Sequence, residues 1–418
     1  MKVRVSIKEI WEYVSIFTLL LECSSIYFNM VVGMPITSNW LLIIGFFPLT
    51  ISAILKHVKS KKTRVISIVL LYFLYTAVYA VTLGKQETIN YAMKFWMIFP
   101  CILIYIVSIS EDGTIIRYLN KYINVVCIIA SSSLLFWIFG SLLKIIPATG
   151  TVQYVWGSMS QTARSYFNIH FETQIEKTFI GITRNTAFFT EAPKFSLILL
   201  FAYLFNELFR HSKRIRILLG ITIVSTLAYS GVIGILLIHF CRYTINVIRD
   251  IASRKSKVRT IVWPILMLSG VIIFWYLMDT KLSTSSGVGR LGDFIVCIST
   301  GLQHPFFGFG FMDNEYLNTV LHAYRLSTGV GNTMGLSNSI CQIFIDGGLY
   351  LLILYIVPAC NVLMKGIKSR KYILVIFSIF YMYMFTTTYF AYTGMIFFLI
   401  SIFIGITSTK KWNIVTLN

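Results

Sequence analysis

Apolar residues occur along the chain in long runs that short polar segments separate. A membrane-spanning helix needs about 20 largely apolar residues, and about twelve runs approach that length. They cover residues 13–32, 39–55, 65–83, 93–109, 123–143, 195–209, 217–229, 232–247, 261–278, 340–363, 372–388 and 391–407. The pattern predicts an all-α polytopic membrane protein with about 12 transmembrane helices, folded as a single integral membrane domain over residues 1–418. The run 217–229 is short, so it could be tilted, extended at its ends or re-entrant.

Two polar segments, 146–193 and 279–339, are far longer than the other connections. Loops of this length in a compact protein are usually functional or disordered. Both contain aromatic residues, which favour ordered and packed structure. We therefore expect the chemistry of the protein in these two loops, with the helices as their scaffold.

Basic residues indicate how the chain is oriented. The connections on the same side as the N-terminus hold 26 of the 36 Lys and Arg residues. Because basic residues concentrate on the cytoplasmic side of membrane proteins, this bias predicts cytoplasmic termini and two long loops outside the membrane. The start of the sequence leads into an apolar run without a small-residue cleavage site, so we expect a first helix and not a removed signal peptide.

The composition agrees with this class. Of all residues 56% are apolar and 12% are charged, and the mean hydropathy is +0.76, whereas a soluble domain is about a quarter charged. The net charge of +20 lies in short clusters between apolar runs, which indicates topogenic charge and no nucleic-acid partner. Seven scattered cysteines form no Cys-x-x-Cys pair, so no disulfide framework or zinc site is implied.

Four arginines lie in the predicted outer loops, against the charge bias. A guanidinium binds phosphate through two N–H groups at once, which near a membrane suits a diphosphate-linked lipid. The alternative is an arginine that pairs with a local acid or reaches lipid headgroups. For Arg290 that acid would be Asp293, three residues on. The four are Arg164, Arg184, Arg290 and Arg325.

Acid–base candidates are few. Glu191 is the acid of the segment 184–195, next to the start of a predicted helix. His304 and His322 lie in the second loop, and a histidine can take a proton from a sugar hydroxyl near pH 7. The loops contain no His-x-x-x-His or Asp-x-Asp pattern, so we expect no metal and no cofactor. The sequence GVGRLG at 287–292 lacks a βαβ context, so we interpret its glycines as a tight turn around Arg290.

Three patches resemble a known family when they are taken in order. The first is RNTAFFTEAPKF at 184–195, and the second is YSGVIGI at 229–235. The third is GRLGDFIVCISTGLQHPFFGFG at 289–310, followed by a predicted helix that opens with Asn338 and closes on a Gly-Gly pair. The set is similar to the Wzy-type O-antigen and capsular polysaccharide polymerases of the O-antigen polymerase/ligase superfamily. The second patch lacks the arginine that this family carries there.

The resemblance implies a metal-independent membrane glycosyltransferase in the bacterial inner membrane. The donor would be a glycan on undecaprenyl diphosphate, and the acceptor a sugar hydroxyl of another lipid-linked repeat unit. Membrane lipid and a chain-length regulator protein would be its other partners. Arg290 and Arg184 would hold the diphosphate, and Glu191 or His304 would orient or deprotonate the acceptor. The other substrate-binding candidates are Arg164, His322, Arg325 and Asn338.

Two alternatives remain. In the ligase branch of the superfamily a His-Asn pair tends to open the helix after the second loop, whereas this chain has Ser337-Asn338, which favours the polymerase. A flippase or other transporter of lipid-linked oligosaccharides would also suit twelve helices. Transporters keep charged sites near the middle of the bilayer, whereas these predicted helices are nearly free of charge.

Overall fold

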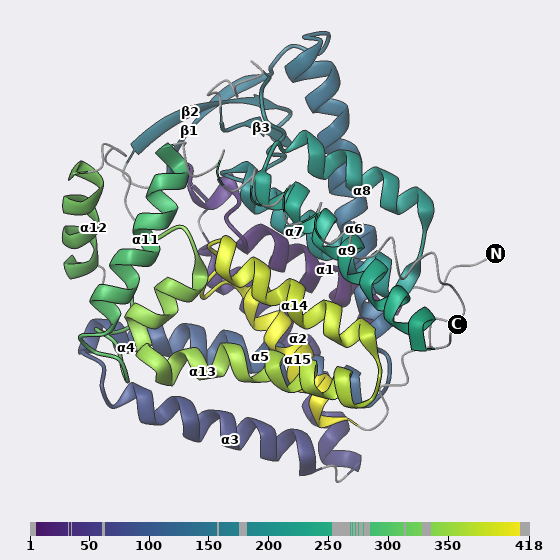
Figure 1. The fold of residues 1–418 in the computed structure, drawn as a ribbon, viewed down its shortest axis with the longest axis vertical. Coiled ribbons are helices and arrows are strands. Elements are labelled where there is room, and N and C mark those ends of the chain that lie inside the picture. Colours follow the sequence, from purple (N-terminus) through teal and green to yellow (C-terminus); the bar gives the residue numbers. More distant parts are fainter. Residues whose placement is uncertain are drawn as a thin grey trace.

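The computed structural model describes residues 6–31, 33–34, 36–60, 63–156, 159–174, 182–252, 285–312, 315–327 and 336–409, with single residues between 268 and 279. Helices make up most of it (Figure 1). They are α1 (Ile7–Glu22), α2 (Ser38–Ser60), α3 (Thr63–Ala80), α4 (Lys85–Tyr91), α5 (Phe99–Glu111), α6 (Ile115–Phe136), α7 (Ala192–Phe205), α8 (Lys213–Ser225), α9 (Tyr229–Ala252), α11 (Ser285–Gly301), α12 (Glu315–Ser327), α13 (Ser339–Lys368), α14 (Tyr372–Thr387) and α15 (Gly394–Ser408). A 3-10 turn follows α1 at η1 (Ile26–Phe28), and π-helical turns occur at η2 (Ala92–Ile98), η3 (Trp137–Leu142) and η4 (Asn206–Arg210).

Most of the predicted apolar runs lie in helices where the structure describes them, and the run 261–278 lies almost entirely outside the described residues. The run 13–32 is an exception, because α1 ends at Glu22 and only the 3-10 turn η1 follows it. Six helical segments are long and apolar enough to cross a membrane: Ser38–Lys59, Glu87–Glu111, Ile115–Leu142, Ala192–Arg210, Tyr229–Val247 and Ser339–Lys368. Three shorter helices are also apolar. The chain is therefore a helical protein of the multi-pass membrane type.

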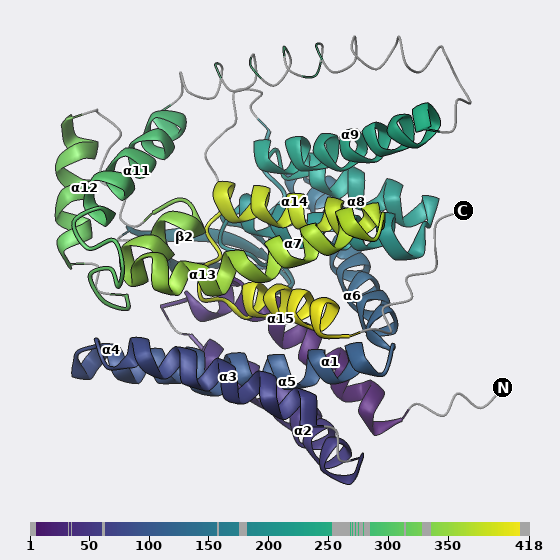
Figure 2. The ribbon, with the colours of Figure 1, turned by 60° about the horizontal axis from the view of Figure 1, so that its bottom comes forward.

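The helices pack in layers. In Figure 2, α2, α3 and α5 lie on one side, α9 lies on the other, and α7, α13, α14 and α15 lie between them. Nearly every residue of α7 and α15 is buried. These two helices are apolar all round, as expected for helices at the centre of a bundle.

The first long loop departs from the all-α prediction because it contains a three-stranded antiparallel sheet. Its strands are β1 (Gly150–Trp156), β2 (Met159–Tyr166) and β3 (His170–Glu172), in that order. In β1, buried Tyr154 alternates with exposed Gln153 and Val155, which is the period-two pattern of a half-buried strand. A search for runs of about 20 apolar residues cannot detect so short an alternation.

The second long loop is largely helical, since α11 and α12 occupy most of its described part. The predicted glycine turn around Arg290 is wrong, because residues 287–292 lie inside α11. Gly292 faces Tyr324 of α12, and a Cβ added there would lie 2.1 Å from the Cε1 atom of the tyrosine ring. The glycine therefore allows two helices to approach closely, although each glycine costs a helix about 1 kcal/mol relative to alanine.

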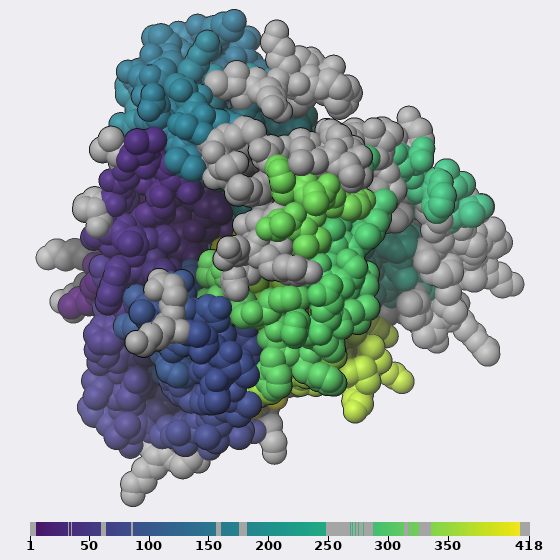
Figure 3. All heavy atoms as spheres, turned by 90° about the vertical axis from the view of Figure 1, so that its left-hand side faces the viewer, coloured from purple at the N-terminus to yellow at the C-terminus, as the bar shows by residue number. Residues whose placement is uncertain are grey.

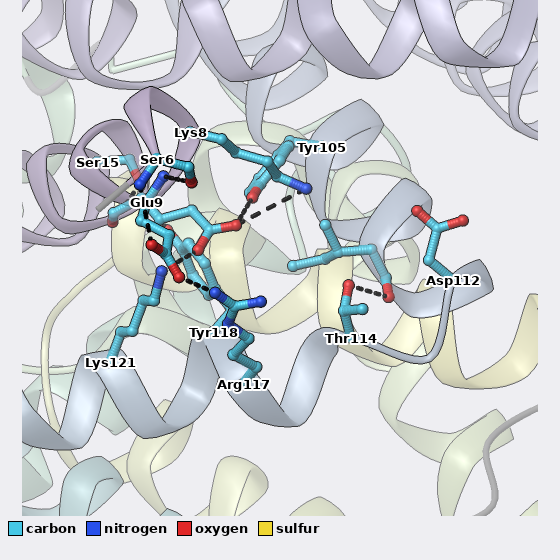
Figure 4. A network of polar contacts seen from close by, with 12 residues as sticks. Ser6, Lys8, Glu9, Ser15, Tyr105, Asp112, Thr114, Arg117, Tyr118 and Lys121 are labelled. Carbon is cyan, nitrogen blue, oxygen red and sulfur yellow. Dashed lines mark hydrogen bonds and ion pairs between the residues drawn. The ribbon is translucent and has the colours of Figure 1, made fainter. Parts of the chain in front are cut away.

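Described connections from each of the two predicted sets contact one another at opposite ends of the bundle. At the end that carries both termini, Arg117 and Lys121 of α6 bind the carboxylates of Glu9 and Glu12 on α1 (Figures 1 and 4). At the other end the first long loop joins the turn after α1, where the Ile26 amide donates to the Phe188 carbonyl at 2.8 Å. The second long loop approaches α4, because a Cβ added at Gly310 would lie 2.8 Å from Oε1 of Glu87. The segments on the predicted inner side thus contact one another, and so do those on the predicted outer side.

Candidate functional site

Three patches of the sequence meet at the end of α14 and at residues 387–393, which we call the α14–α15 segment. From the third patch, Arg290 donates through Nη1 to the carbonyl oxygen of Thr387 at 2.6 Å. From the first patch, the Lys194 ammonium donates to the carbonyl of Tyr389. One turn earlier in α14, the Tyr383 hydroxyl donates to the carbonyl of Ser230, in the second patch, at 2.9 Å. Regions that are far apart in the sequence are therefore held by one short segment.

The contact of Arg290 has a local physical reason. Thr387 is the last residue of α14, and the carbonyls of a final helical turn lack partners within the helix. A cation there satisfies such a carbonyl and interacts favourably with the helix dipole. A guanidinium has five N–H donors, and the described contact of this half-buried arginine uses one of them. The rest of its fork is the part that an anionic ligand would engage.

The sequence suggested Asp293 as a partner of Arg290. In the structure Asp293 pairs with Arg325 instead. Nη2 of Arg325 lies 2.7 Å from Oδ1 of Asp293, and the Ser337 amide donates to Oδ2 at 2.8 Å. Asp293 is 1% exposed and Arg325 is 5% exposed. This buried ion pair ties α11, α12 and the start of α13 together. Its burial supports a structural role for Arg325, which the sequence placed among the substrate-binding residues.

Glu191 lies at the N-cap position of α7 with extended backbone (φ −151°, ψ 149°), and its side chain caps no amide of the helix. Its Oε1 atom is 3.9 Å from Nζ of Lys194, and the carboxylate side chain is 24% exposed while that of the lysine is 5% exposed. The Lys194 ammonium also lies 4.7 Å from the centroid of the Tyr389 ring, within the range of a cation–π interaction. A partly accessible acid thus sits beside a buried cation.

Lys194 was not among the predicted site residues. The signal for it was present in the sequence, because an acid and a lysine three residues apart at the start of a helix share one face.

Gln174 links Arg184 to the start of α7, where Glu191 lies. Its Oε1 atom accepts from the Ala192 amide, the first of α7, at 3.1 Å and from Nη1 of Arg184 at 3.5 Å. The guanidinium therefore lies beside the N-terminus of α7, next to Glu191. A second ion pair, between Glu22 and Lys94 at 3.1 Å, lies close by, since Glu22 also accepts from the first amide of α15 at 2.8 Å.

The start of α13 completes the site. Asn338 caps this helix, and its Oδ1 atom accepts from the Cys341 amide at 2.9 Å, as its place at the opening of the predicted helix suggested. The Ser339 hydroxyl donates to the Thr388 carbonyl at 2.9 Å and fastens the helix to the α14–α15 segment. Asn338 Nδ2, Ser337 Oγ and Thr388 Oγ1 are buried polar atoms without a hydrogen-bond partner among the described residues. Buried polar atoms are rarely left unsatisfied, so this group is suited to bind a polar ligand.

The 304–310 loop, HPFFGFG, has a structural role. The backbone of α13 is interrupted at Gly348 (φ 56°, ψ −157°), which frees backbone groups on both sides of the break. The loop supplies their partners, with hydrogen bonds of 2.8–3.1 Å: Phe309 N to Ile345 O, Gly310 N to Asp346 O, Leu349 N to Pro305 O and Tyr350 N to Phe306 O. Gly308 has φ 70°, and a Cβ there would lie 2.4 Å from the Ile345 carbonyl.

Three other predicted residues lie away from the α14–α15 segment in their described contacts. His304 is exposed, and its ring meets Phe309 of its own loop edge-on at 4.5 Å. His322 is exposed on α12. The Arg164 side chain, on β2, is 61% exposed and lies 3.9 Å from Glu172, which is a weak surface contact. On the face shown in Figure 3, the N-terminal part of the chain (purple) adjoins the region of the sheet (blue).

Among the described residues, no three His, Cys, Asp or Glu side chains are grouped as a metal ion requires. No protein-family model matches the chain, and neither does any curated protein.

Proposed function

We propose that the protein is a polysaccharide polymerase that transfers a growing glycan from undecaprenyl diphosphate to a sugar hydroxyl of a lipid-linked repeat unit. The observation that carries this proposal is the convergence of Arg290 and Lys194 on the α14–α15 segment, with Glu191 beside Lys194. Cations beside a partly accessible carboxylate and unsatisfied buried polar atoms suit a substrate that combines a diphosphate with sugar hydroxyls.

Each residue of the candidate site has a role in the proposed glycosyl transfer. The acceptor oxygen attacks the anomeric carbon of the donor, the bond from that carbon to the diphosphate oxygen breaks, and the hydroxyl proton passes to the Glu191 carboxylate. Arg290 and Arg184 stabilise the charge that develops on the leaving diphosphate. His304 is the alternative base, although its described contacts lie with the 304–310 loop. Asn338 would donate through Nδ2 to a sugar oxygen, because that group is buried and has no described partner.

In this proposal about twelve helices cross the bacterial inner membrane, both termini are cytoplasmic and the site lies at the outer face. The distribution of basic residues supports the orientation, and the grouping of the connections at two ends of the bundle agrees with it. Reporter fusions after residues 281 and 368 test the orientation. A cytoplasmic signal at the first position, or an external signal at the second, contradicts it.

The decisive experiment is reconstitution of the purified chain in liposomes with a synthetic undecaprenyl-diphosphate repeat unit. A ladder of products that are each one repeat unit longer supports a polymerase. Transfer of a preformed glycan to a different acceptor, without a ladder, indicates the ligase alternative. Adding a chain-length regulator should narrow the distribution of lengths without being needed for bond formation.

A transporter is the second candidate, and one observation favours it. Asp346 is fully buried beside the break in α13, where Gln342 donates to it at 2.9 Å and Tyr392 at 2.8 Å. Interrupted helices with buried charges form the sites of many transporters. Here, however, the 304–310 loop already satisfies the broken backbone, which favours a structural role for the break. Movement of the lipid-linked unit across the liposome membrane without new glycosidic bonds would reverse this preference.

A further inference from the structure

A pocket of about 590 Å³ lies between α1, α6 and α8, at the end of the molecule opposite to the candidate site. Its lining combines apolar side chains with two arginines, and includes Asn124, Ile128, Arg210, Arg214 and Leu218. It is an open groove on the surface of the helices, so a ligand in it would stay partly exposed to its surroundings. Arg210 is the last residue of η4, and Arg214 lies in the first turn of α8.

The pocket lies where an apolar surface meets a charged one. Ile128 of α6, which lines the pocket, is 70% exposed. Beside the pocket on α8, Ile217 and Ile221, which do not line it, are 61% and 54% exposed. Exposed isoleucines on membrane-type helices face hydrocarbon, whereas Arg210 and Arg214 are exposed at the ends of η4 and α8 that carry the basic residues. The pocket therefore spans the boundary between acyl chains and headgroups.

The two arginines keep a positive charge that no described carboxylate neutralises. Nη1 of Arg210 donates to the neutral side-chain oxygen of Asn124 at 2.5 Å. The buried acid of this region, Glu207, is already paired with Arg216 and Arg242. Two guanidinium groups above an apolar groove complement a phosphate that carries acyl chains.

We propose that this pocket binds an anionic phospholipid, with its phosphate between Arg210 and Arg214 and its acyl chains along the exposed isoleucines of α6 and α8. This lipid would be a bound partner of the scaffold, separate from the lipid-linked substrate. The proposal is independent of glycosyl transfer. In the proposed orientation the lipid belongs to the cytoplasmic leaflet.

Native mass spectrometry of the purified full chain, titrated with dioleoyl phosphatidylglycerol or dioleoyl phosphatidylcholine, tests this. We expect the anionic lipid to bind at least about tenfold more tightly, and the Arg210→Gln/Arg214→Gln variant to bind it about 10- to 100-fold more weakly. A matched control, Lys59→Gln/Lys368→Gln, removes the same charge from exposed residues of the same end and should bind as the parent does.

A second variant keeps the test decisive if the double arginine variant fails to fold. Leu218→Trp fills the pocket without a change of charge and should weaken phosphatidylglycerol binding by a comparable factor. Equal affinity for both lipids, or unchanged binding by both pocket variants, overturns the proposal. Competition by millimolar inorganic phosphate would show a simple anion site and would also overturn it.

Discussion

The Lys194 ammonium donates a hydrogen bond to the backbone carbonyl of Tyr389 and also lies 4.7 Å from the centroid of the ring of the same residue. Its position is fixed by a residue 195 places further along the chain. Two residues before Tyr389, the Thr387 carbonyl accepts from Arg290. The α14–α15 segment therefore sets the distance between two cations from different parts of the sequence, and changes within it should affect both.

Glu191→Gln should reduce polymer formation by about 100-fold or more, since general-base catalysis typically contributes that much. The substitution keeps the shape of a partly exposed side chain, so the amount of folded protein should stay normal. Product ladders from liposomes measure the effect. The control is Glu9→Gln, which changes a carboxylate that is 25% exposed at the opposite end of the bundle. A mild effect here together with a severe effect of His304→Ala would transfer the role of base to His304.

Arg290→Ala should slow transfer roughly 10- to 200-fold, because a charged hydrogen bond to phosphate contributes about 1.5–3 kcal/mol. Arg290→Lys should recover only part of the rate, since it keeps the charge but loses the planar fork. Initial rates at normal protein level measure both variants. Full-length polymer at the parental rate from Arg290→Ala would remove this residue from the site.

Arg325 and Asp293 should behave as a structural pair. Each single alanine variant should lose about 3–5 kcal/mol of stability, because it leaves a buried charge without its partner. The double variant Asp293→Ala/Arg325→Ala should lose less than the sum of the two. Detergent-resistant folded protein after heating measures these losses. Additive losses would show that the two residues do not act together.

Gly308→Ala should strongly reduce the amount of folded protein. The residue has φ 70°, and a methyl group there would lie 2.4 Å from the Ile345 carbonyl, so the loop could not close on the break in α13. Gly150→Ala is the matched control, since no atom lies within 4 Å of its added Cβ. Fluorescence-detected size-exclusion chromatography compares the two, and equal yields would contradict the structural role of the 304–310 loop.

The three-stranded sheet should lose stability at acidic pH because it buries His170. Burial lowers the pKa of its imidazole from 6.5 to about 4, and neither ring nitrogen has a hydrogen-bond partner among the described residues. Between these values the unfolded loop binds a proton that the folded loop excludes. Above about pH 6.5, His170 does not reduce the free energy of unfolding of the loop. As the pH falls towards 4, that free energy decreases by up to about 3 kcal/mol.

Hydrogen exchange of residues 150–172 as a function of pH checks this, with His170→Phe as the comparison. The variant keeps an apolar ring next to Phe136, whose centroid lies 6.3 Å from that of the imidazole. It should remove most of the acid sensitivity of the sheet. The same loss of protection in the parent and the variant would assign that sensitivity to another group.

The amino-acid sequence predicted the helical membrane class of the protein and most of its helices. Length and apolarity are local properties, so runs such as 340–363 and 372–388 predicted α13 and α14 without knowledge of their neighbours. The family resemblance likewise placed Asn338 at the opening of a helix, and in the structure its side chain caps α13 by accepting from the Cys341 amide. The charge bias of the connections predicted two sets of segments, and described members of each set contact one another in the structure.

The hydrogen-bond and ion-pair partners of these residues followed only from the tertiary structure. Asp293 binds Arg325, 32 residues away, and not Arg290, which is three residues away, because the packing of α11 against α12 and α13 buries the carboxylate on their side. The 304–310 loop resembled a functional motif, yet it completes the broken backbone of α13 at residues 345–350. Lys194 and Arg290 are both held by backbone carbonyls of the α14–α15 segment. Every residue has such a carbonyl, so no residue type in the sequence indicates these contacts. Local patterns specify lengths and faces of elements, whereas pairing depends on which faces the fold brings into contact.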